Sequence, residues 1–190
     1  MSIVRRLGRR ILKRVGGSGS ADGPSTSPAP PPSAAVRDPQ ELSDDPVVIA
    51  DLWAIRAAIE PTDRPILINH WATWCDGCVA ELPDLVKLHA RYGDKVRFLG
   101  ISWETFQASQ PHDKLAEHIQ AFCEEQGVTW QTLMVTDAPD DLFAGLELKV
   151  RTIPQTVLVT ADGDEVFRCE EPLHDDALTK LGEALAAATA

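Results

Sequence analysis

Two cysteines three positions apart, Cys75 and Cys78, stand between an apolar run and a helical pattern. The apolar run covers residues 65–71 and has the length and composition of a buried strand. Apolar residues with the spacing of one helix face follow the second cysteine, at Val79, Leu82, Leu85, Val86 and Leu88. The chain is therefore expected to pass from a strand through a short turn into a helix, with Cys75 near the helix N-terminus.

That position favours a reactive thiol at Cys75. The unpaired N–H groups and the positive end of the helix dipole stabilise a thiolate, and such a placement can lower a cysteine pKa from about 8.5 to between about 3.5 and 7.5. Cys78 lies close to one turn further along, within disulfide reach of Cys75. We predict that Cys75 is the attacking nucleophile and that Cys78 resolves the mixed disulfide.

Two other interpretations of the cysteine pair remain open at this stage. A zinc site needs four ligands and usually a second pair at similar spacing, whereas Cys123 and Cys169 are 46 residues apart. A structural disulfide that closes so short a loop restrains little chain. Redox chemistry is the favoured interpretation, and Cys123, beside Phe122 in a helical pattern, is most simply a small buried hydrophobe.

Charge is distributed unevenly along the 190 residues. The formal net charge is −11, but residues 1–17 hold six basic residues and no acidic one, so the remainder carries −17. An acidic body argues against nucleic acid as the main partner. Composition and charge divide the chain into a basic amphipathic segment (1–17), a disordered linker rich in Gly, Ser and Pro (18–45) and a folded domain (46–190).

The N-terminal segment and the free cysteines bear on location. No run approaches the ~18 apolar residues of a membrane-spanning helix, and none near the N-terminus has the apolar core of a secretory signal. Residues 1–17 can lie as an amphipathic helix on an anionic membrane surface, although an organelle presequence or an inert tail stays open. Unpaired thiols suit a reducing compartment. We expect a monomer in the cytoplasm, with peripheral membrane contact through residues 1–17.

Strand and helix patterns alternate through the folded part. Strands are predicted over residues 47–50, 66–71, 96–103, 129–135, 156–160 and 165–169, and helices over 52–59, 75–92, 114–126, 141–148 and 175–188. The last two strands flank Ala161-Asp162-Gly163-Asp164, a hairpin signal. This order predicts an α/β sandwich with a central mixed sheet flanked by helices.

Several motifs together resemble the thioredoxin-like superfamily, and within it the TlpA/ResA-type thiol–disulfide oxidoreductases. They are the segment from Asn69 to Cys75 (NHWATWC), Glu81-Leu82-Pro83 after the second cysteine, a late Ile153-Pro154, and an extra helix and strand over roughly residues 111–135. The resemblance covers about residues 46–188. It implies the three-layer thioredoxin-like sandwich and an exported location, which the N-terminus does not signal.

The resemblance also implies roles for particular residues. Pro154 is expected to be a cis-proline facing the cysteine pair, and the Ile153 backbone to pair with an extended substrate. Glu81 is expected near the site, where it would relay the proton of Cys78; a solvated helix carboxylate is the alternative. Trp74, Asp76 and Gly77 complete the expected substrate-contacting set.

The resulting hypothesis is a protein-disulfide oxidoreductase, with reduction as the favoured direction. Its expected partners are a disulfide-bearing protein and an upstream thiol reductant, and it is expected to need no cofactor and no metal. The alternatives are a peroxide-reducing redoxin and a copper-binding chaperone of the same fold, the second because Cu(I) prefers soft thiolates. His70, five residues before Cys75 on a buried strand, is expected to be a satisfied core histidine rather than a group that tunes the thiolate.

Overall fold

The computed structural model describes residues 44–137, 150 and 152–190. The expected N-terminal segment, nearly all of the expected linker and the helix predicted over 141–148 lie outside these residues. The elements are β1 (Val47–Ala50), α2 (Leu52–Ile59), β2 (Ile66–Trp71), α3 (Asp76–Tyr92), β3 (Arg97–Ser102), the 3-10 helix η2 (Glu104–Phe106), α4 (His112–Gln126), β4 (Thr132–Val135), β5 (Gln155–Val159), β6 (Glu165–Cys169) and α6 (Asp175–Ala188).

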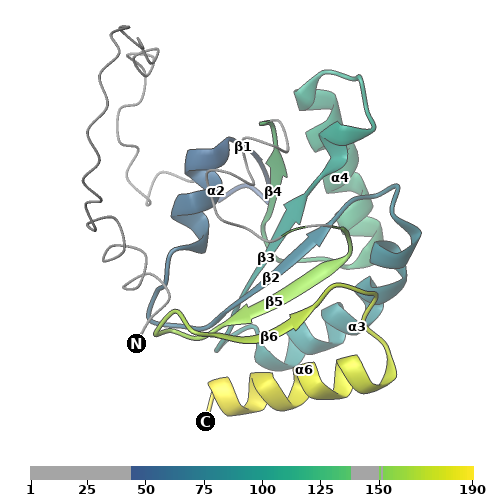
Figure 1. The fold of residues 1–190 in the computed structure, drawn as a ribbon. Coiled ribbons are helices and arrows are strands. Elements are labelled where there is room, and N and C mark those ends of the chain that lie inside the picture. The colour runs from purple at the N-terminus through teal and green to yellow at the C-terminus, as the bar shows by residue number, and fades with distance from the viewer. Residues whose placement is uncertain (1–43, 138–149, 151) are drawn as a thin grey trace, which may run out of the picture.

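Six strands form one mixed sheet in the order β1-β4-β3-β2-β5-β6. The pairs from β1 through β2 are parallel, and β5 joins β2 antiparallel before turning into the hairpin with β6. Gly163 occupies the hairpin turn with a φ of 83°, a left-handed conformation that glycine adopts without steric cost. The expectation of a central mixed sheet flanked by helices is confirmed (Figure 1).

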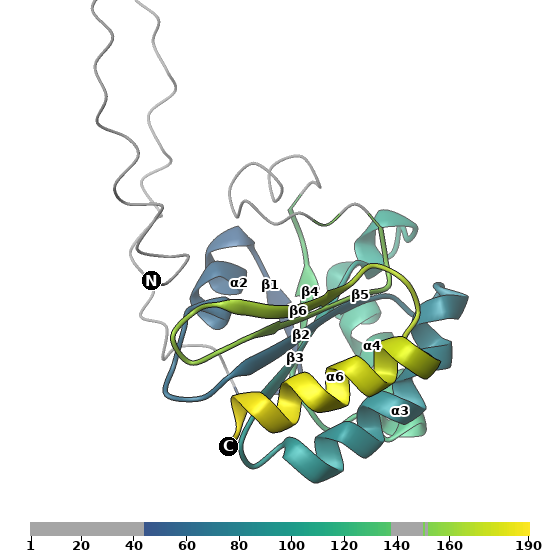
Figure 2. The same cartoon turned by 60° about the horizontal axis from the view of Figure 1, so that its bottom comes forward.

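Alternate residues of β2 face the two sides of the sheet. Leu67 and Trp71 join a core cluster with residues of α3, α4 and α6. Ile66 and Ile68 join a second cluster with residues of α2, β3 and β4. This period of two is the geometry of an extended strand, and it places α2 on one face and α3, α4 and α6 on the other (Figure 2).

The turn between β2 and α3 places the cysteine pair just beyond the carboxyl end of the inner strand β2. The sheet strand β2 ends at Trp71, and α3 begins at Asp76. Cys75 is the N-cap of α3, with extended backbone at φ −96° and ψ 99°. Helix α3 then buries Leu82 and Leu85 against the sheet, which fixes the direction of its N-terminus relative to the strand.

Candidate active site

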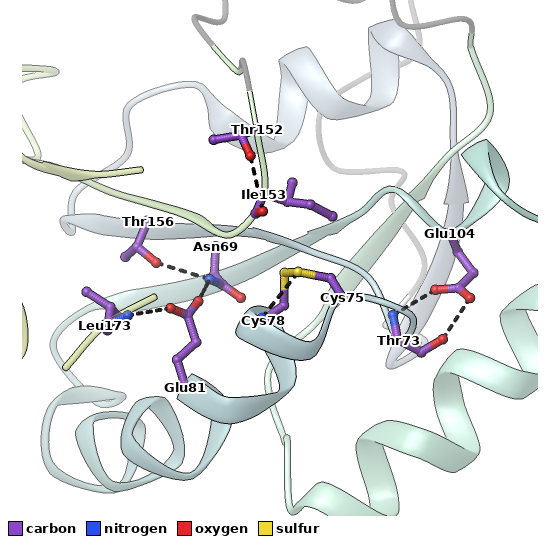
Figure 3. Close-up of a disulfide and its surroundings, with 10 residues drawn as sticks. All are labelled: Asn69, Thr73, Cys75, Cys78, Glu81, Glu104, Thr152, Ile153, Thr156 and Leu173. Carbon is purple, nitrogen blue, oxygen red and sulfur yellow. Dashed lines mark hydrogen bonds between the residues drawn. A yellow bond between two sulfur atoms is a disulfide. The ribbon is translucent and has the colours of Figure 1, made fainter. Parts of the chain in front are cut away.

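Cys75 and Cys78 form a disulfide whose Cα atoms are 5.2 Å apart (Figure 3). The backbone N–H of Cys78 also donates to Cys75 Sγ, at 3.2 Å, so the first turn of α3 directs a donor at this sulfur. Cys75 is partly exposed, whereas Cys78 is completely buried. The two sulfurs therefore differ in access: only the first stands where a large molecule can reach it.

Glu81 lies one turn after Cys78 and is 1% exposed. Asn69 Nδ2 donates to Glu81 Oε1 at 2.8 Å, and the backbone N–H of Leu173 donates to Oε2 at 2.8 Å. Burial raises the pKa of Glu81 from 4.5 to about 7, against the opposing effect of these two hydrogen bonds. The solvated alternative considered for this residue is therefore wrong, because the carboxylate lies inside the protein beside the disulfide (Figure 3).

A second buried acid supports the loop before Cys75, and sequence analysis missed it. Glu104, 4% exposed, accepts hydrogen bonds from the Thr73 backbone N–H at 2.9 Å and from Thr73 Oγ1 at 2.7 Å. Thr73 Oγ1 also lies 3.3 Å from Nε2 of His118. The available signal was an acid placed directly after an apolar strand, between Trp103 and Phe106.

Two prolines lie over the middle of the cysteine loop. The Ile153–Pro154 peptide bond is cis. A Cβ atom built on Gly77 would lie 3.5 Å from Pro154 Cδ and 2.9 Å from Pro172 Cγ. Position 77 therefore has no room for a side chain unless Pro172 moves, and the segment between β6 and α6 is a wall of the site.

The residues expected to contact a substrate surround the pair. Trp74 is 37% exposed and Asp76 is exposed, while Gly77 and Ile153 are partly buried. The carbonyl oxygen of Ile153 lies 3.3 Å from Thr152 Oγ1, which donates to it (Figure 3). The structure thus places this set close to Cys75, and its role in substrate contact stays a prediction.

His70 belongs to the core on the opposite face of β2. It is 1% exposed, and its Nδ1 accepts a hydrogen bond from Trp103 Nε1 at 3.2 Å. Burial, with a smaller effect of Arg168, lowers its pKa from 6.5 to about 3. The imidazole is therefore neutral at ordinary pH, in agreement with the expected core histidine.

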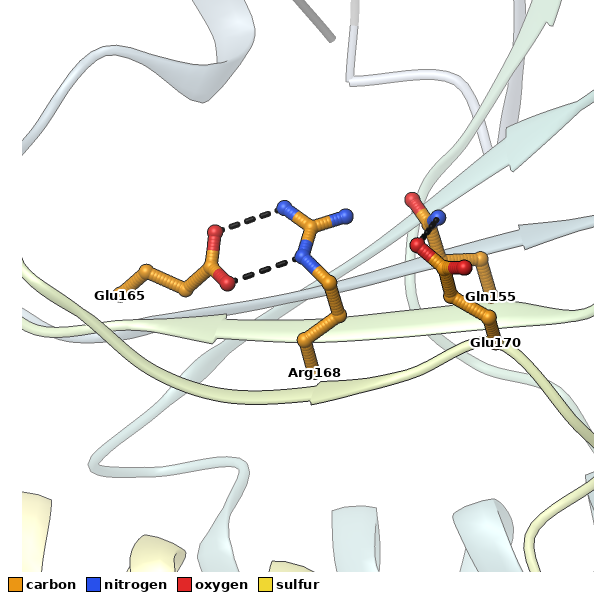
Figure 4. A network of polar contacts seen from close by, with 4 residues as sticks. All are labelled: Gln155, Glu165, Arg168 and Glu170. Carbon is orange, nitrogen blue, oxygen red and sulfur yellow. Dashed lines mark hydrogen bonds and ion pairs between the residues drawn. The ribbon is translucent and has the colours of Figure 1, made fainter. Parts of the chain in front are cut away.

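Polar contacts lie within β6 and between the start of β5 and the segment that leads toward Pro172. Arg168 donates from Nε and Nη2 to the two carboxylate oxygens of Glu165, at 2.8 and 2.6 Å. Gln155 Nε2, on the residue after Pro154, donates to Glu170 Oε1 at 3.3 Å (Figure 4). The second contact links the start of β5 to the chain just beyond β6, close in sequence to the two prolines over the cysteine loop.

The remaining cysteines differ in environment. Cys123 is 5% exposed, and burial raises the pKa of its thiol from 9.0 to about 11. Cys169 is partly exposed on β6, with its Sγ 3.3 Å from the carbonyl oxygen of Glu171. The described residues contain no group of three or more His, Cys, Asp and Glu placed to hold a metal ion. Within the same residues, none of the helices has the length and apolar character needed to cross a membrane.

Comparison with known proteins places this site in a family. The redoxin family model matches residues 57–185. Thiol:disulfide interchange protein HelX of Rhodobacter capsulatus is 30% identical over 124 residues, which are 65% of this chain and 62% of HelX. The structure of a DsbF homologue from Corynebacterium diphtheriae superposes with a TM-score of 0.52 at 20% identity, covering 66% of this chain and 73% of that one. At that identity the superposition shows the fold alone.

A solved disulfide oxidoreductase of Mycobacterium tuberculosis, homologous to DsbE of Escherichia coli, is described as secreted. It is 25% identical, with a TM-score of 0.49 over 65% of this chain and 81% of that one. The cytoplasmic location expected from the sequence is wrong: the relatives that the chain matches include the thiol:disulfide interchange proteins HelX and DsbE and the thiol-disulfide oxidoreductase ResA, and they give that location no support. The expectation depended in part on unpaired thiols, yet a buried thiol such as Cys123 is inert in either kind of compartment.

The chain spans about three-fifths of the length of HelX. It spans about half of the length of YneN, a thioredoxin-like protein of Bacillus subtilis; the two are 25% identical over a segment that is 53% of the present chain. The family model nevertheless runs from within α2 to within α6, and it includes the cysteine pair, both buried acids and the cis-proline. The chain belongs to the redoxin family, in the TlpA/ResA-type branch of the thioredoxin-like superfamily.

Proposed function

We propose that this protein is a thiol–disulfide oxidoreductase that acts on protein disulfides. One observation carries the proposal: the Cys75–Cys78 disulfide joins a partly exposed residue at a helix N-terminus to a fully buried one. A pair arranged in this way can attack an external disulfide with one sulfur and close on itself with the other. The names of the relatives, which include thiol:disulfide interchange proteins, support the same activity.

In the reducing direction the Cys75 thiolate attacks one sulfur of the substrate disulfide. The substrate S–S bond breaks, a mixed disulfide forms at Cys75, and the other substrate sulfur leaves as a thiolate that takes up a proton. The Cys78 N–H and the end of α3 stabilise the attacking thiolate. Cys78 then loses its proton and attacks Cys75 Sγ, which releases the second substrate thiol and leaves the disulfide seen here.

Glu81 is the proposed acceptor of the Cys78 proton. A carboxyl group with a pKa of about 7 is close to half ionised at neutral pH, so it can take up and return a proton with little free-energy cost. Because Glu81 is buried, bulk water does not reach this point to accept the Cys78 proton in its place. When an upstream dithiol reduces the Cys75–Cys78 disulfide again, the same carboxyl group returns a proton to the Cys78 sulfur as it leaves.

The substrate is proposed to lie across Trp74, Asp76 and Gly77, with an extended stretch of its backbone beside Ile153 and Pro154. Trp74 offers a large flat surface that is partly open to solvent, and aromatic groups of this kind contribute strongly to protein interfaces. A backbone pairing at Ile153 would add affinity without requiring a particular substrate sequence.

Turnover of a protein disulfide by the reduced protein tests the proposal, with insulin as the substrate and dithiothreitol as the upstream reductant. Cys75→Ser is expected to abolish turnover. Cys78→Ser is expected to accumulate a mixed disulfide, which a non-reducing gel detects. Cys169→Ser is the matched control and should retain wild-type turnover, because this thiol lies outside the proposed mechanism. Undiminished turnover in Cys75→Ser, or no mixed disulfide in Cys78→Ser, would contradict the assigned roles.

A further inference from the structure

Asn69 is a buried amide on the face of β2 that packs against α3. Its neighbours at a spacing of two, Leu67 and Trp71, belong to the same core cluster as Cys78. The side chain is 3% exposed. Its amide lies between Glu81 and the disulfide, and its oxygen points toward the disulfide (Figure 3).

The nitrogen and the oxygen of this amide differ in their hydrogen-bond partners. The nitrogen, Nδ2, donates to Glu81 Oε1 at 2.8 Å and to Thr156 Oγ1 at 3.0 Å. The oxygen, Oδ1, is buried and meets no hydrogen-bond donor among the described residues. An ionised Glu81 accepts hydrogen bonds and cannot donate one, so it holds the amide in this orientation. Buried polar atoms are nearly always paired, and an exception calls for an explanation.

The missing donor appears when the disulfide is reduced. The sulfur of Cys78 carries no hydrogen in the disulfide, whereas the reduced thiol has one S–H, and this residue is completely buried. We infer that Asn69 Oδ1 accepts a hydrogen bond from the Cys78 thiol in the dithiol state. This inference rests on the proposed function and adds a redox-dependent partner to the same site.

The consequence is a bias of the site toward its dithiol form. One thiolate of a dithiol reductant attacks Cys75 Sγ, the S–S bond breaks, and Cys78 leaves as a thiolate that takes a proton from Glu81, or from solvent at a pH where Glu81 is already ionised. The second thiolate of the reductant then breaks the mixed disulfide, which releases Cys75 as a thiolate and leaves the reductant as a disulfide. The thiol then satisfies Oδ1, which the disulfide leaves unpaired. Since an unpaired buried acceptor costs free energy, Asn69 makes reduction more favourable and the reduction potential less negative than the same site would have without it.

The test compares the equilibrium constant for reduction of the Cys75–Cys78 disulfide in wild type, Asn69→Leu and Thr156→Val. Each protein is titrated in dithiothreitol buffers above pH 8, where Glu81 is ionised, and followed by thiol alkylation. Asn69→Leu removes the acceptor but keeps the volume, and it should lower the constant about tenfold, which is about 30 mV for two electrons. Thr156→Val removes a partner of the amide nitrogen in both redox states, so its constant should change less than twofold.

A fall of fivefold or more in Asn69→Leu, with the control within twofold, supports the inference. A smaller fall, a rise, or an equal fall in the control overturns it. Failure of the proposed function would look different, because wild type itself would then form no reversible disulfide or would not turn over a protein disulfide.

A second measurement leaves position 69 unchanged, in case Asn69→Leu does not fold. The infrared S–H stretch of Cys78 is recorded in Cys75→Ser, with the spectrum of a protein that also carries Cys78→Ala subtracted. A band below the frequency of the same thiol group in a hydrocarbon solvent supports the hydrogen bond, and a band at that frequency overturns it.

Discussion

Replacement of Glu81 by glutamine tests whether burial holds a proton on this side chain. The carboxyl group is 1% exposed and accepts two hydrogen bonds. Glutamine keeps the shape and one acceptor oxygen but cannot ionise. The variant therefore removes the titration of Glu81 and leaves most of the surrounding packing intact.

The direction in which the free energy of unfolding changes with pH follows from the raised pKa of Glu81. The pKa of Glu81 is about 7 in the folded protein and 4.5 without its surroundings. Between these values the folded protein binds more protons than the unfolded chain, so the free energy of unfolding falls as the pH rises. At about 1.4 kcal/mol per pH unit, the loss is about 3 kcal/mol, complete somewhat above pH 7 and absent below about pH 4.

The assay is urea unfolding of the oxidised protein at a series of pH values from 4 to 9, for wild type and Glu81→Gln. The difference between the two free energies of unfolding isolates the titration of this residue. We expect the variant to gain about 3 kcal/mol on wild type between pH 4 and pH 8. Glu183→Gln, at an exposed position of α6, is the control and should keep a constant difference within about 0.5 kcal/mol.

A difference between wild type and Glu81→Gln that does not vary with pH would refute the reasoning, since it would mean that folding does not change the pKa of Glu81. A difference that changes in the opposite direction would mean that the two hydrogen bonds outweigh burial. In either case the proposed proton transfer from Cys78 would need another acceptor.

Three further predictions concern the surroundings of the pair. Gly77→Ala places a methyl group 2.9 Å from a proline ring, so it should lower the free energy of unfolding of the oxidised protein in urea by about 1–3 kcal/mol. Gly182→Ala has open space at its Cβ and should raise the free energy of unfolding by about 0.5–1 kcal/mol. Equal effects of the two substitutions would contradict the packing described at Gly77. Glu104→Ala should lower the free energy of unfolding by about 2–3 kcal/mol in the same assay. Glu104→Gln should lower it less, because glutamine keeps an acceptor for the loop before the disulfide. Equal losses of stability in the two variants would contradict the two hydrogen bonds. At pH 8, iodoacetamide should label Cys123 of the native protein far more slowly than Cys169. The labelling rate of Cys123 should rise about tenfold per pH unit up to about pH 11, where its thiol is half ionised. Equal labelling rates of the two cysteines would contradict the raised pKa of the buried thiol.

The elements that depend on local pattern were predicted well. β2 has the predicted bounds of 66–71, because its apolar run is bounded by a proline and a turn. β4 begins at Thr132 rather than at 129, since its pairing with β1 and β3 starts there. Trp130 instead packs its ring against His89 and Phe98. Such a boundary is set by neighbours far away in the sequence, which a single-sequence pattern does not contain.

In the site, too, the local motif could be predicted from the sequence and the long-range contacts could not. The pair Cys75 and Cys78 is a local motif, and its strand–turn–helix context follows from periodicity alone. The contacts that surround it are not local, since Glu104 lies 31 residues from its partner Thr73. The helical pattern around Glu81 does not distinguish a buried acid from an exposed one, so the burial of this residue became visible only in the folded chain.

The hydrogen bond from Leu173 to Glu81 spans 92 positions and comes from the segment just before the last helix. A ribosome adds about 5–20 residues per second, so roughly 5–20 s separate the synthesis of the cysteine pair from that of the backbone group that completes its surroundings. Cys123 is made about midway through that interval, so three thiols then belong to an unfinished chain. The order in which these sulfurs are made and covered, rather than the finished fold, decides which of them can meet first.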